Sequence, residues 1–416
     1  RSSVAGTYAV RVVPTGAYTG TVMVGVTQTA AASLPVGVAA QPISLAAGQN
    51  GVYSFSSTQG QNLGFGLTNL STSPSNRTLT VTIANSNGTV LASYSPWYST
   101  AYALPTLPMT DTYTVTVDPG TAAATFNLQL LADQTATLAL NGVPTTYTSN
   151  AAGQYATYSF AGVAGQSNAV IVTGNSFSGS TYVYVYKPDG TLWTSTSTSG
   201  STQFNLPALP VAGAYSLRVE PQGTATGSLT LGMTQSAAGG VLNASGGALG
   251  ANLAAGQKAT YTFSGTQGQN AGLGLTGLAT TPSGKSVTVT IADSDGTQVG
   301  SFTASASTGY AVPTLPITDT YTVTIDPGMA AAQFGVQFLV DNTAALVANA
   351  APTAFASNAV GQYATYSFAG TAGQSDALVV SANALTGGAT IYVYTPDGAQ
   401  WDAASVSKGS STQINL

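Results

Sequence analysis

Apolar and polar residues alternate along short stretches of this chain, in the pattern of half-buried β-strands. Residues 78–84 read TLTVTIA, residues 112–118 read TYTVTVD and residues 126–132 read FNLQLLA. Every second side chain of such a stretch faces a core, so each stretch predicts a strand. Turn signals such as Asn87-Gly88 and Asp189-Gly190 separate the strands, because glycine supplies the positive φ that tight turns need. No segment has convincing helical periodicity, so the pattern predicts an all-β fold.

These strand patterns recur at a fixed spacing. The related words are GVYSFSSTQGQN (51–62), ATYSFAGVAGQS (156–167), ATYTFSGTQGQN (259–270) and ATYSFAGTAGQS (364–375). A second word, such as DTYTVTV, places its tyrosine at Tyr8, Tyr113, Tyr215 and Tyr321. The repeated unit is therefore about 104 residues long and holds about eight short strands.

The repeated units alternate between two types. PTLPMTDTYTVTVDPG (105–120) returns as PTLPITDTYTVTIDPG (313–328), and YVYVYKPDG (182–190) returns as IYVYTPDG (391–398). The order is thus A-B-A-B. Because each sheet must bury its apolar face, we expect tandem antiparallel β-sandwich domains of the jelly-roll or immunoglobulin-like kind. The expected ranges are 1–37 (the last part of an incomplete unit), 38–139 (A), 140–243 (B), 244–347 (A) and 348–416 (the first part of an incomplete B unit).

The recurring words resemble a known family. The order "GQ…Y.F.G..GQ", then "V.V..PDGT", then "LP.LP..G.Y.V.V.P" is similar to bacterial pre-peptidase C-terminal (PPC) domains, over essentially the whole chain. The resemblance implies jelly-roll-like β-sandwiches of the kind appended to secreted enzymes and repeated in large bacterial surface proteins. The chain has no peptidase region for such domains to assist. The resemblance therefore implies an accessory or structural role and offers no active site.

Composition narrows the chemistry further. Only 5% of residues are charged, Glu220 is the single glutamate, and histidine and cysteine are absent. These absences exclude a Ser-His-Asp triad, a thiol nucleophile and ordinary zinc or iron–sulfur sites. We therefore expect no enzyme, although an aspartate-only glycosidase is formally open. No basic patch could neutralise a phosphate backbone, so nucleic acid is not an expected partner. No apolar run is long enough to span a membrane.

One stretch is a candidate cation site. In ADSDGT (292–297), Asp293 and Asp295 could offer oxygens to calcium, which is a hard cation. The first A unit has asparagine at both positions, Asn85 and Asn87, and no glutamate follows in the loop. A plain hairpin turn is the alternative. No other cofactor is indicated.

Tyrosines carry the remaining candidate features. Tyr182, Tyr184 and Tyr186 share one face of a predicted strand, and Tyr392 and Tyr394 repeat the arrangement. Such a face could be a platform for sugars or for a neighbouring subunit, or it could be part of the sheet with hydroxyls that reach solvent. The tyrosine of each "G/D-x-Y-x-V" word predicts a tyrosine corner, in which the hydroxyl bonds to nearby backbone.

The first and last stretches complement each other. Residues 1–37 correspond to the last third of a unit and residues 348–416 to the first two thirds. An open sheet edge is a template for strand addition from another chain, and a head-to-tail contact that does not close produces a filament. The expected assembly residues are Val4, Tyr8, Val10, Val12, Ile414 and Leu416. The alternative is a window from a longer covalent array of the same repeats.

The leading hypothesis is a structural subunit of an extracellular bacterial filament or surface fibre, which binds itself head to tail and could also adhere to a surface polysaccharide. The low charge leaves little repulsion between copies. The second hypothesis is a PPC-like accessory module of a secreted enzyme or adhesin, which would bind polysaccharide or calcium.

Overall fold

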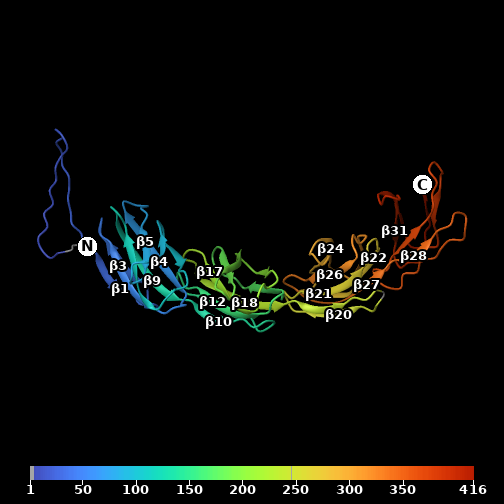
Figure 1. Ribbon diagram of the computed structural model, residues 1–416, viewed down its shortest axis with the longest axis horizontal. Coiled ribbons are helices and arrows are strands. Elements are labelled where there is room, and N and C mark those ends of the chain that lie inside the picture. The colour runs from blue at the N-terminus through green and yellow to red at the C-terminus, as the bar shows by residue number, and fades with distance from the viewer. Residues whose placement is uncertain (1–3, 245) are drawn as a thin grey trace. The chain divides into compact units, whose positions relative to one another are not determined.

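The computed structural model describes residues 4–244 and 246–416, which form strands, turns and extended connections without a helix (Figure 1). The prediction of an all-β chain is confirmed for these residues. They accordingly contain no helix that could cross a membrane. By its contacts the chain divides into two compact units. One holds residues 1–134, 149–157 and 219–226, and the other holds residues 135–148, 158–218 and 227–416.

The first A repeat has nine strands in two sheets. They are β1 (Ala30–Ser33), β2 (Gln41–Leu45), β3 (Gly51–Ser57), β4 (Leu63–Ser73), β5 (Thr80–Ala84), β6 (Val90–Tyr94), β7 (Thr100–Ala103), β8 (Asp111–Asp118) and β9 (Ala123–Ala132). One sheet has the order β1-β3-β8-β5-β6 and the other β2-β9-β4-β7. The alternation read from the sequence sets which side chains face inward: in β8, Tyr113, Val115 and Val117 are buried between half-buried threonines. Both sheets contribute to a single apolar core.

The second A repeat copies this arrangement. Its strands are β19 (Ala237–Val241), β20 (Leu249–Leu253), β21 (Ala259–Gly265), β22 (Ala271–Thr281), β23 (Val287–Ala292), β24 (Gln298–Ala304), β25 (Thr308–Val312), β26 (Asp319–Asp326) and β27 (Ala331–Val340). The register is also kept, because Phe263 pairs with Tyr321 as Phe55 pairs with Tyr113. Its sheets again enclose one core.

The first B repeat also has nine strands. They are β10 (Gln134–Thr137), β11 (Thr145–Ser149), β12 (Ala156–Gly162), β13 (Asn168–Thr173), β14 (Thr181–Tyr186), β15 (Leu192–Thr198), β16 (Thr202–Asn205), β17 (Gly213–Pro221) and β18 (Gly227–Gln235). The sheet orders are β10-β12-β17-β14-β15 and β11-β18-β13-β16. The last two strands of this repeat, β17 and β18, thus lie inside the two sheets. β17 lies between β12 and β14, and β18 lies between β11 and β13.

The pairing departs from the expected organisation in two ways. The first strand pairs in parallel in three of the repeats, as β1 does with β3, β19 with β21 and β28 (Asn342–Ala345) with β29 (Ala364–Ser367), so the sheets are not purely antiparallel. These first strands also precede the expected boundaries at residues 37/38, 243/244 and 347/348, and β10 precedes the one at 139/140. The segment that leaves one repeat belongs to a sheet of the next, so the expected ranges end several residues too late.

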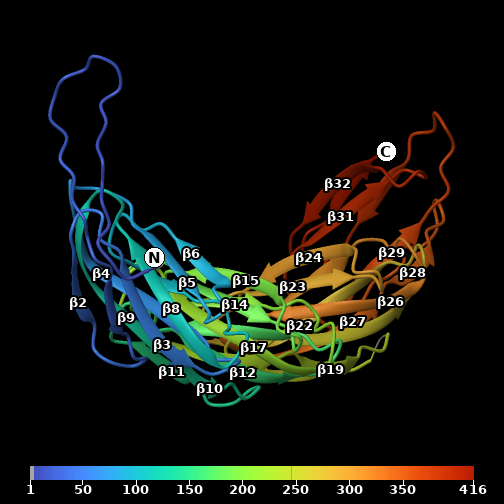
Figure 2. The same ribbon diagram turned by 60° about the vertical axis from the view of Figure 1, so that its left-hand side comes forward.

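The second B repeat has its strands only in separate pairs. The pairs are β28 with β29, β30 (Ala377–Val380) with β33 (Thr412–Asn415), and β31 (Ala389–Tyr394) with β32 (Gln400–Val406). In Figure 2 the ribbon of β31 and β32 lies apart from that of β28 and β29. The described part of this repeat has no counterpart of β17 or β18, and residues 351–358, which correspond to the region of β11, form no strand. The missing counterparts of β17 and β18 would connect the pairs.

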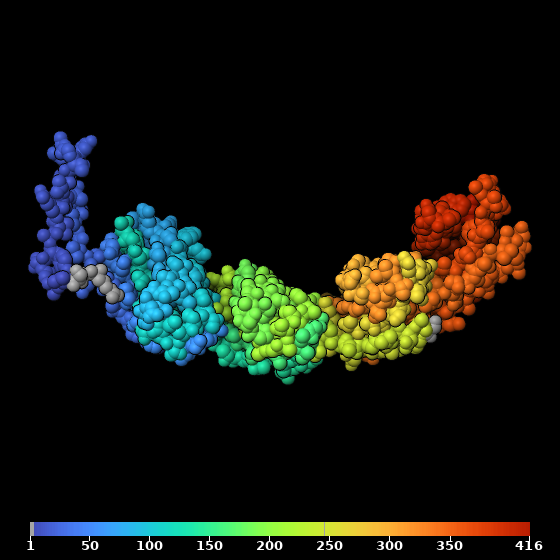
Figure 3. Space-filling model, in the orientation of Figure 1, coloured from blue at the N-terminus to red at the C-terminus, as the bar shows by residue number. Residues whose placement is uncertain are grey.

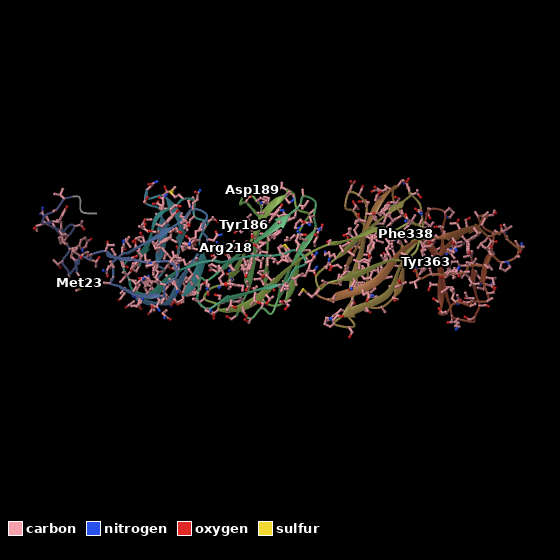
Figure 4. All side chains as sticks on the ribbon, turned by 90° about the horizontal axis from the view of Figure 1, so that it is seen from below. Met23, Tyr186, Asp189, Arg218, Phe338 and Tyr363 are labelled. Carbon is pink, nitrogen blue, oxygen red and sulfur yellow. The ribbon has the colours of Figure 1, made fainter. Side chains whose placement is uncertain are left out.

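Residues 4–29, called the N-terminal segment below, carry no regular strand and are almost entirely exposed. In Figure 1 they form a long open loop, drawn in dark blue, and in Figure 3 they form a thin projection from the first A repeat. Met23, labelled in Figure 4, has a side chain that is 95% exposed. An extended, apolar and unpaired stretch of this length requires a partner if its side chains are to leave water.

Candidate assembly site

The N-terminal segment is similar in sequence to β17 and β18. Tyr8 corresponds to Tyr215 of β17, and Val26 corresponds to Met233 of β18. The inward-facing residues of β17 and β18 are buried, with Tyr215 only 1% exposed. Their counterparts are exposed, with Tyr8 at 61%. These exposed counterparts are Tyr8, Val10, Val12, Val22, Val24 and Val26.

The four predicted tyrosine corners are present. Each hydroxyl donates to the carbonyl oxygen four residues earlier, at 2.8 Å for Tyr113, 2.8 Å for Tyr215 and 2.7 Å for Tyr321. Tyr8 makes the same bond to Val4 at 2.7 Å, although neither residue is buried. The local turn that starts this strand therefore forms without its neighbouring strands, so part of the ordering cost is met before any partner binds.

The second B repeat lacks the partners of its core aromatic residues. In the first B repeat, Phe160 stacks on Tyr215 with ring centroids 5.3 Å apart, and Trp193 lies 5.6 Å from the same ring. The corresponding Phe368 and Trp401 are 38% and 55% exposed. The equivalent phenylalanine–tyrosine pair also stacks in both A repeats, at 5.4 and 5.2 Å. The ring that would complete this pair in the second B repeat corresponds to Tyr8.

The other expected assembly residues are placed differently. Val4, Val10 and Val12 are exposed, whereas Ile414 is buried and pairs with Leu378 between β33 and β30. The backbone N–H of Leu416 donates to the carbonyl of Asp376 at 2.8 Å. These two C-terminal residues thus already have partners within their own repeat.

The candidate calcium residues act in a turn. The Asp293 carboxylate accepts the backbone N–H groups of Asp295 at 3.1 Å and Thr297 at 2.8 Å. Asn85 accepts the N–H of Thr89 in the same way, at 2.8 Å, so the amide performs the same capping. Within the described residues no group of three or more His, Cys, Asp or Glu side chains could hold a metal ion. Calcium binding stays an untested prediction.

The nearby Asp319 is also used for capping. Its carboxylate accepts the backbone N–H of Ser294 at 2.8 Å, and this bond holds its pKa below the usual range. Asp111 does the same for Ser86 in the first A repeat. The acidic residues of these loops therefore stabilise turns.

The tyrosine face lies on the outer side of β14. Val183 and Val185 are fully buried, and the three tyrosines between and beside them are half-buried. The rings of Tyr182 and Tyr184 stack at 5.9 Å. Figure 4 labels Tyr186 on this repeat, together with Arg218, which is only 6% exposed.

Tyr392 and Tyr394, in the second B repeat, are more exposed, and their ring centroids are 6.5 Å apart. The more exposed pair belongs to the repeat with separated strand pairs.

A second aromatic site was missed by the sequence reasoning. Trp97 and Tyr98 are more than half exposed, with ring centroids 4.9 Å apart in an edge-on arrangement. Tyr98 and Tyr102 line a shallow cavity with Tyr155, Glu220 and Gln222. The second A repeat has Ser305 and Ala306 in place of Trp97 and Tyr98. This departure between two otherwise similar repeats was the available signal.

Comparisons with known proteins add little. No protein-family model matches the chain, and no curated protein matches it. Among solved structures, the chain resembles PliG from Aeromonas hydrophila, a periplasmic inhibitor of g-type lysozyme, with 20% identity and a TM-score of 0.18 over 24% of this chain and 99% of that one. It also resembles the CUB1-EGF-CUB2 region of human MASP-1/3, with 8% identity and a TM-score of 0.17 over 47% and 100% of the two chains. Likenesses at this level carry no argument about fold or function.

Proposed function

We propose that the chain is a structural subunit of an extracellular bacterial filament or surface fibre, assembled head to tail. Residues 6–14 and 20–28 of one copy would take the places of β17 and β18 in the second B repeat of the next. The observation that carries this proposal is the complementarity within the described residues. The second B repeat has its strands only in separate pairs. The N-terminal segment is similar in sequence to β17 and β18, the two strands that lie inside the sheets of the first B repeat.

The first B repeat supplies the register of the proposed joint. There, β13 pairs with β18 so that Val170 lies opposite Met233 and Val172 opposite Leu231. The equivalent pairs across the joint are Leu378 with Val26 and Val380 with Val24. Tyr8 would stack on Phe368 and lie against Trp401.

Apolar burial would contribute to holding such a joint. Burying one valine or leucine side chain contributes roughly 1.5–3 kcal/mol, and the N-terminal segment would bury six inward-facing residues. The cost of association is about 4–15 kcal/mol, before side-chain ordering is included. The ladder hydrogen bonds of two inserted strands add specificity of register.

We further propose that each completed repeat is a jelly-roll-like β-sandwich of PPC type. The two sheets with a common core in each A repeat support this proposal. The same pairing would also complete repeats within one longer covalent array. Intact-mass measurement of native material separates the two cases, since a mass near 41.4 kDa supports strand donation and a multiple supports an array.

A pair of neighbouring substitutions tests the strand donation. Val12 corresponds to the fully buried Val219, and Val13 corresponds to Glu220. Val12→Glu would place a charge in the core of the joint, and we expect it to weaken self-association about a hundredfold or more, because burying an unpaired charge costs several kcal/mol. Val13→Glu installs the residue found at this position in the first B repeat, and should leave association unchanged. Sedimentation velocity measures both; equal association of the two variants would contradict the proposal.

A second candidate function is glycan binding at Trp97 and Tyr98, which favours an accessory or adhesive role. Exposed aromatic faces beside a few polar groups are typical of ligand sites. Trp97→Ala should abolish retention on the polysaccharide that the wild type binds in a glycan screen, while Trp193→Ala should leave retention unchanged. No retention of the wild type on any glycan would remove this candidate.

A further inference from the structure

Consecutive B and A repeats are held together by specific contacts. The Thr234 hydroxyl donates to the carbonyl of Gly256 at 2.8 Å, and the Gln257 amide donates to the carbonyl of Gln235 at 3.1 Å. Ile171 of β13 lies directly on Gly256, since a Cβ added there would be 2.0 Å from its side chain. These contacts fasten the end of β18, and β13 beside it, to the loop that precedes β21.

A further contact joins the same pair of repeats, and it comes from strand β16 of the B repeat. The Gln203 amide, in β16, donates to the Asp326 carboxylate at 3.4 Å. The Asp326 carboxylate also forms an ion pair with Lys258 at 3.0 Å. The junction therefore uses β13, β16 and the end of β18 from the B repeat. From the A repeat that follows, it uses the loop before β21 and the end of β26.

Half of this junction already exists at the N-terminal segment. The Thr27 hydroxyl donates to the carbonyl of Gly48 at 2.8 Å, and the Gln49 amide donates to the carbonyl of Gln28 at 2.8 Å. These bonds match those of Thr234 and Gln257. The other half is empty: Gly48 has no atom within contact distance of an added Cβ, although its φ of 74° is close to the 77° of Gly256. The surface around Gly48 thus has the same backbone as the surface that Ile171 covers in the internal junction, but it is exposed.

We propose that the strand-accepting copy covers this surface, so that the joint between copies includes a second contact, onto the first A repeat of the donor. This inference rests on the proposed strand donation and extends it from the inserted strands to a whole repeat. Val379 corresponds to Ile171 and is 61% exposed. It lies on Gly48 of the donor, and Gln413, which corresponds to Gln203, bonds to Asp118, which corresponds to Asp326. The occupant is a second copy of this chain.

The second contact has a structural consequence. Inserted strands alone would hold the donor's A repeat only through the connection after residue 29 and the hydrogen bonds of Thr27 and Gln49. With Val379 and Gln413 seated on it, the contact between copies repeats the one between the first B repeat and the second A repeat. Each joint of the filament then has the same geometry as an internal junction.

Cysteine pairs test this contact, because the chain contains no cysteine of its own. Three full-length variants would be treated with the same short bis-maleimide at a concentration where the chain assembles. Gln203→Cys with Asp326→Cys is the internal control, and should cross-link within one chain. Met23→Cys with Ser381→Cys reports strand donation, because the corresponding Thr230 and Thr173 are opposite each other in β18 and β13. Asp118→Cys with Gln413→Cys reports the second contact.

We expect the last two variants to give ladders of linked chains on a denaturing gel, in similar yield. Adding Val12→Glu to either should reduce the ladder to background. A ladder from the Met23/Ser381 pair without one from the Asp118/Gln413 pair would overturn the second contact and keep strand donation, provided that the internal control reacts. No ladder from either pair, with a reacting control, would overturn both.

Discussion

At the residue scale, the most regular feature is the tyrosine hydroxyl that closes a turn four residues earlier. It occurs in both A repeats, in the first B repeat and at Tyr8. Sequence reasoning could predict this feature because the tyrosine, its spacing and its strand pattern are all local. It could not predict that Tyr8 would form the bond while exposed, since that depends on which strands lie beside it.

The tyrosine corners give a matched pair of substitutions. Tyr215→Phe removes a hydroxyl that serves the carbonyl of Val211 within a packed repeat, so we expect a loss of about 1–2 kcal/mol in the free energy of unfolding of that repeat. Tyr8→Phe should leave the unfolding of the isolated chain unchanged and weaken self-association instead. Urea denaturation and sedimentation measure the two effects. A loss of unfolding free energy for Tyr8→Phe in dilute monomer would contradict this assignment.

Asp341 gives a prediction about pH. Burial raises its pKa above the usual value, although the Thr365 hydroxyl, which donates to its carboxylate at 2.7 Å, opposes the rise. A raised pKa means that the folded state binds the proton more tightly. This carboxyl group therefore stabilises the fold when protonated, below the pKa of the unfolded chain, and the contribution is lost as pH rises through the folded pKa.

Asp341→Asn should remove this dependence, so its thermal midpoint relative to wild type should be higher at pH 7 than at pH 4. Asp111→Asn is the control of opposite sign, because backbone and side-chain hydrogen bonds from Ser86 hold the pKa of Asp111 low. Its midpoint relative to wild type should be lower at pH 7 than at pH 3. A pH-independent difference for Asp341→Asn would contradict the expected sign.

At the element scale, consecutive A and B repeats meet through glycine. Gly272 of β22 lies so close to the next repeat that an added Cβ would be 2.0 Å from the carbonyl oxygen of Gly361. The same is true of Gly64 in the first A repeat, where an added Cβ would be 1.7 Å from the carbonyl oxygen of Gly153 in the first B repeat. Near this contact, the Gln337 amide donates to the carbonyl of Val360 at 2.9 Å. Figure 4 labels Tyr363 at this end of the second A repeat, and its ring also faces Gly272.

Gly272→Ala should therefore be strongly destabilising, by about 2 kcal/mol or more, because backbone atoms must move apart to admit the methyl group. Gly250→Ala is the matched control in the same repeat, since its added Cβ would meet only the carbonyl oxygen of Phe334 at 3.9 Å. It should change the free energy of unfolding by less than about 0.5 kcal/mol. Urea denaturation of both variants measures the difference. Equal stability would show that the two repeats separate without cost.

At this scale the sequence predicted the buried face of each strand better than it predicted which strands pair with one another. Alternation in TYTVTVD identified the buried faces of β8 and β26 correctly. The parallel pairing of β1 with β3 was missed, because the alternation of a strand is the same in parallel and antiparallel pairs. The placement of β1, β10, β19 and β28 in the following repeat was missed because these short strands, AAAS, QTAT, AAGGV and NTAA, have no clear alternation of apolar and polar residues. Trp97 and Tyr98 were missed because the second A repeat has Ser305 and Ala306 at these positions, so the repeat pattern does not mark them.

At the scale of the whole molecule, the same residues have different environments in different repeats. Trp193 lies against the buried Tyr215, whereas the corresponding Trp401 is 55% exposed and has no such ring beside it in the described residues. If the N-terminal segment of another copy completes the second B repeat, Trp401 comes to resemble Trp193. The fluorescence of Trp401 should therefore report assembly without an added label.

The measurement uses a chain in which Trp401 is the only tryptophan, made by Trp97→Phe and Trp193→Phe. Its emission should shift to shorter wavelength as chain concentration rises, because the indole leaves water when Tyr8 of another copy covers it. The shift should follow the same concentration dependence as sedimentation, and Val12→Glu on the same chain should remove it. Assembly seen by sedimentation with unchanged Trp401 emission would mean that copies associate through another surface, since the core of a completed second B repeat cannot form without enclosing this side of the indole.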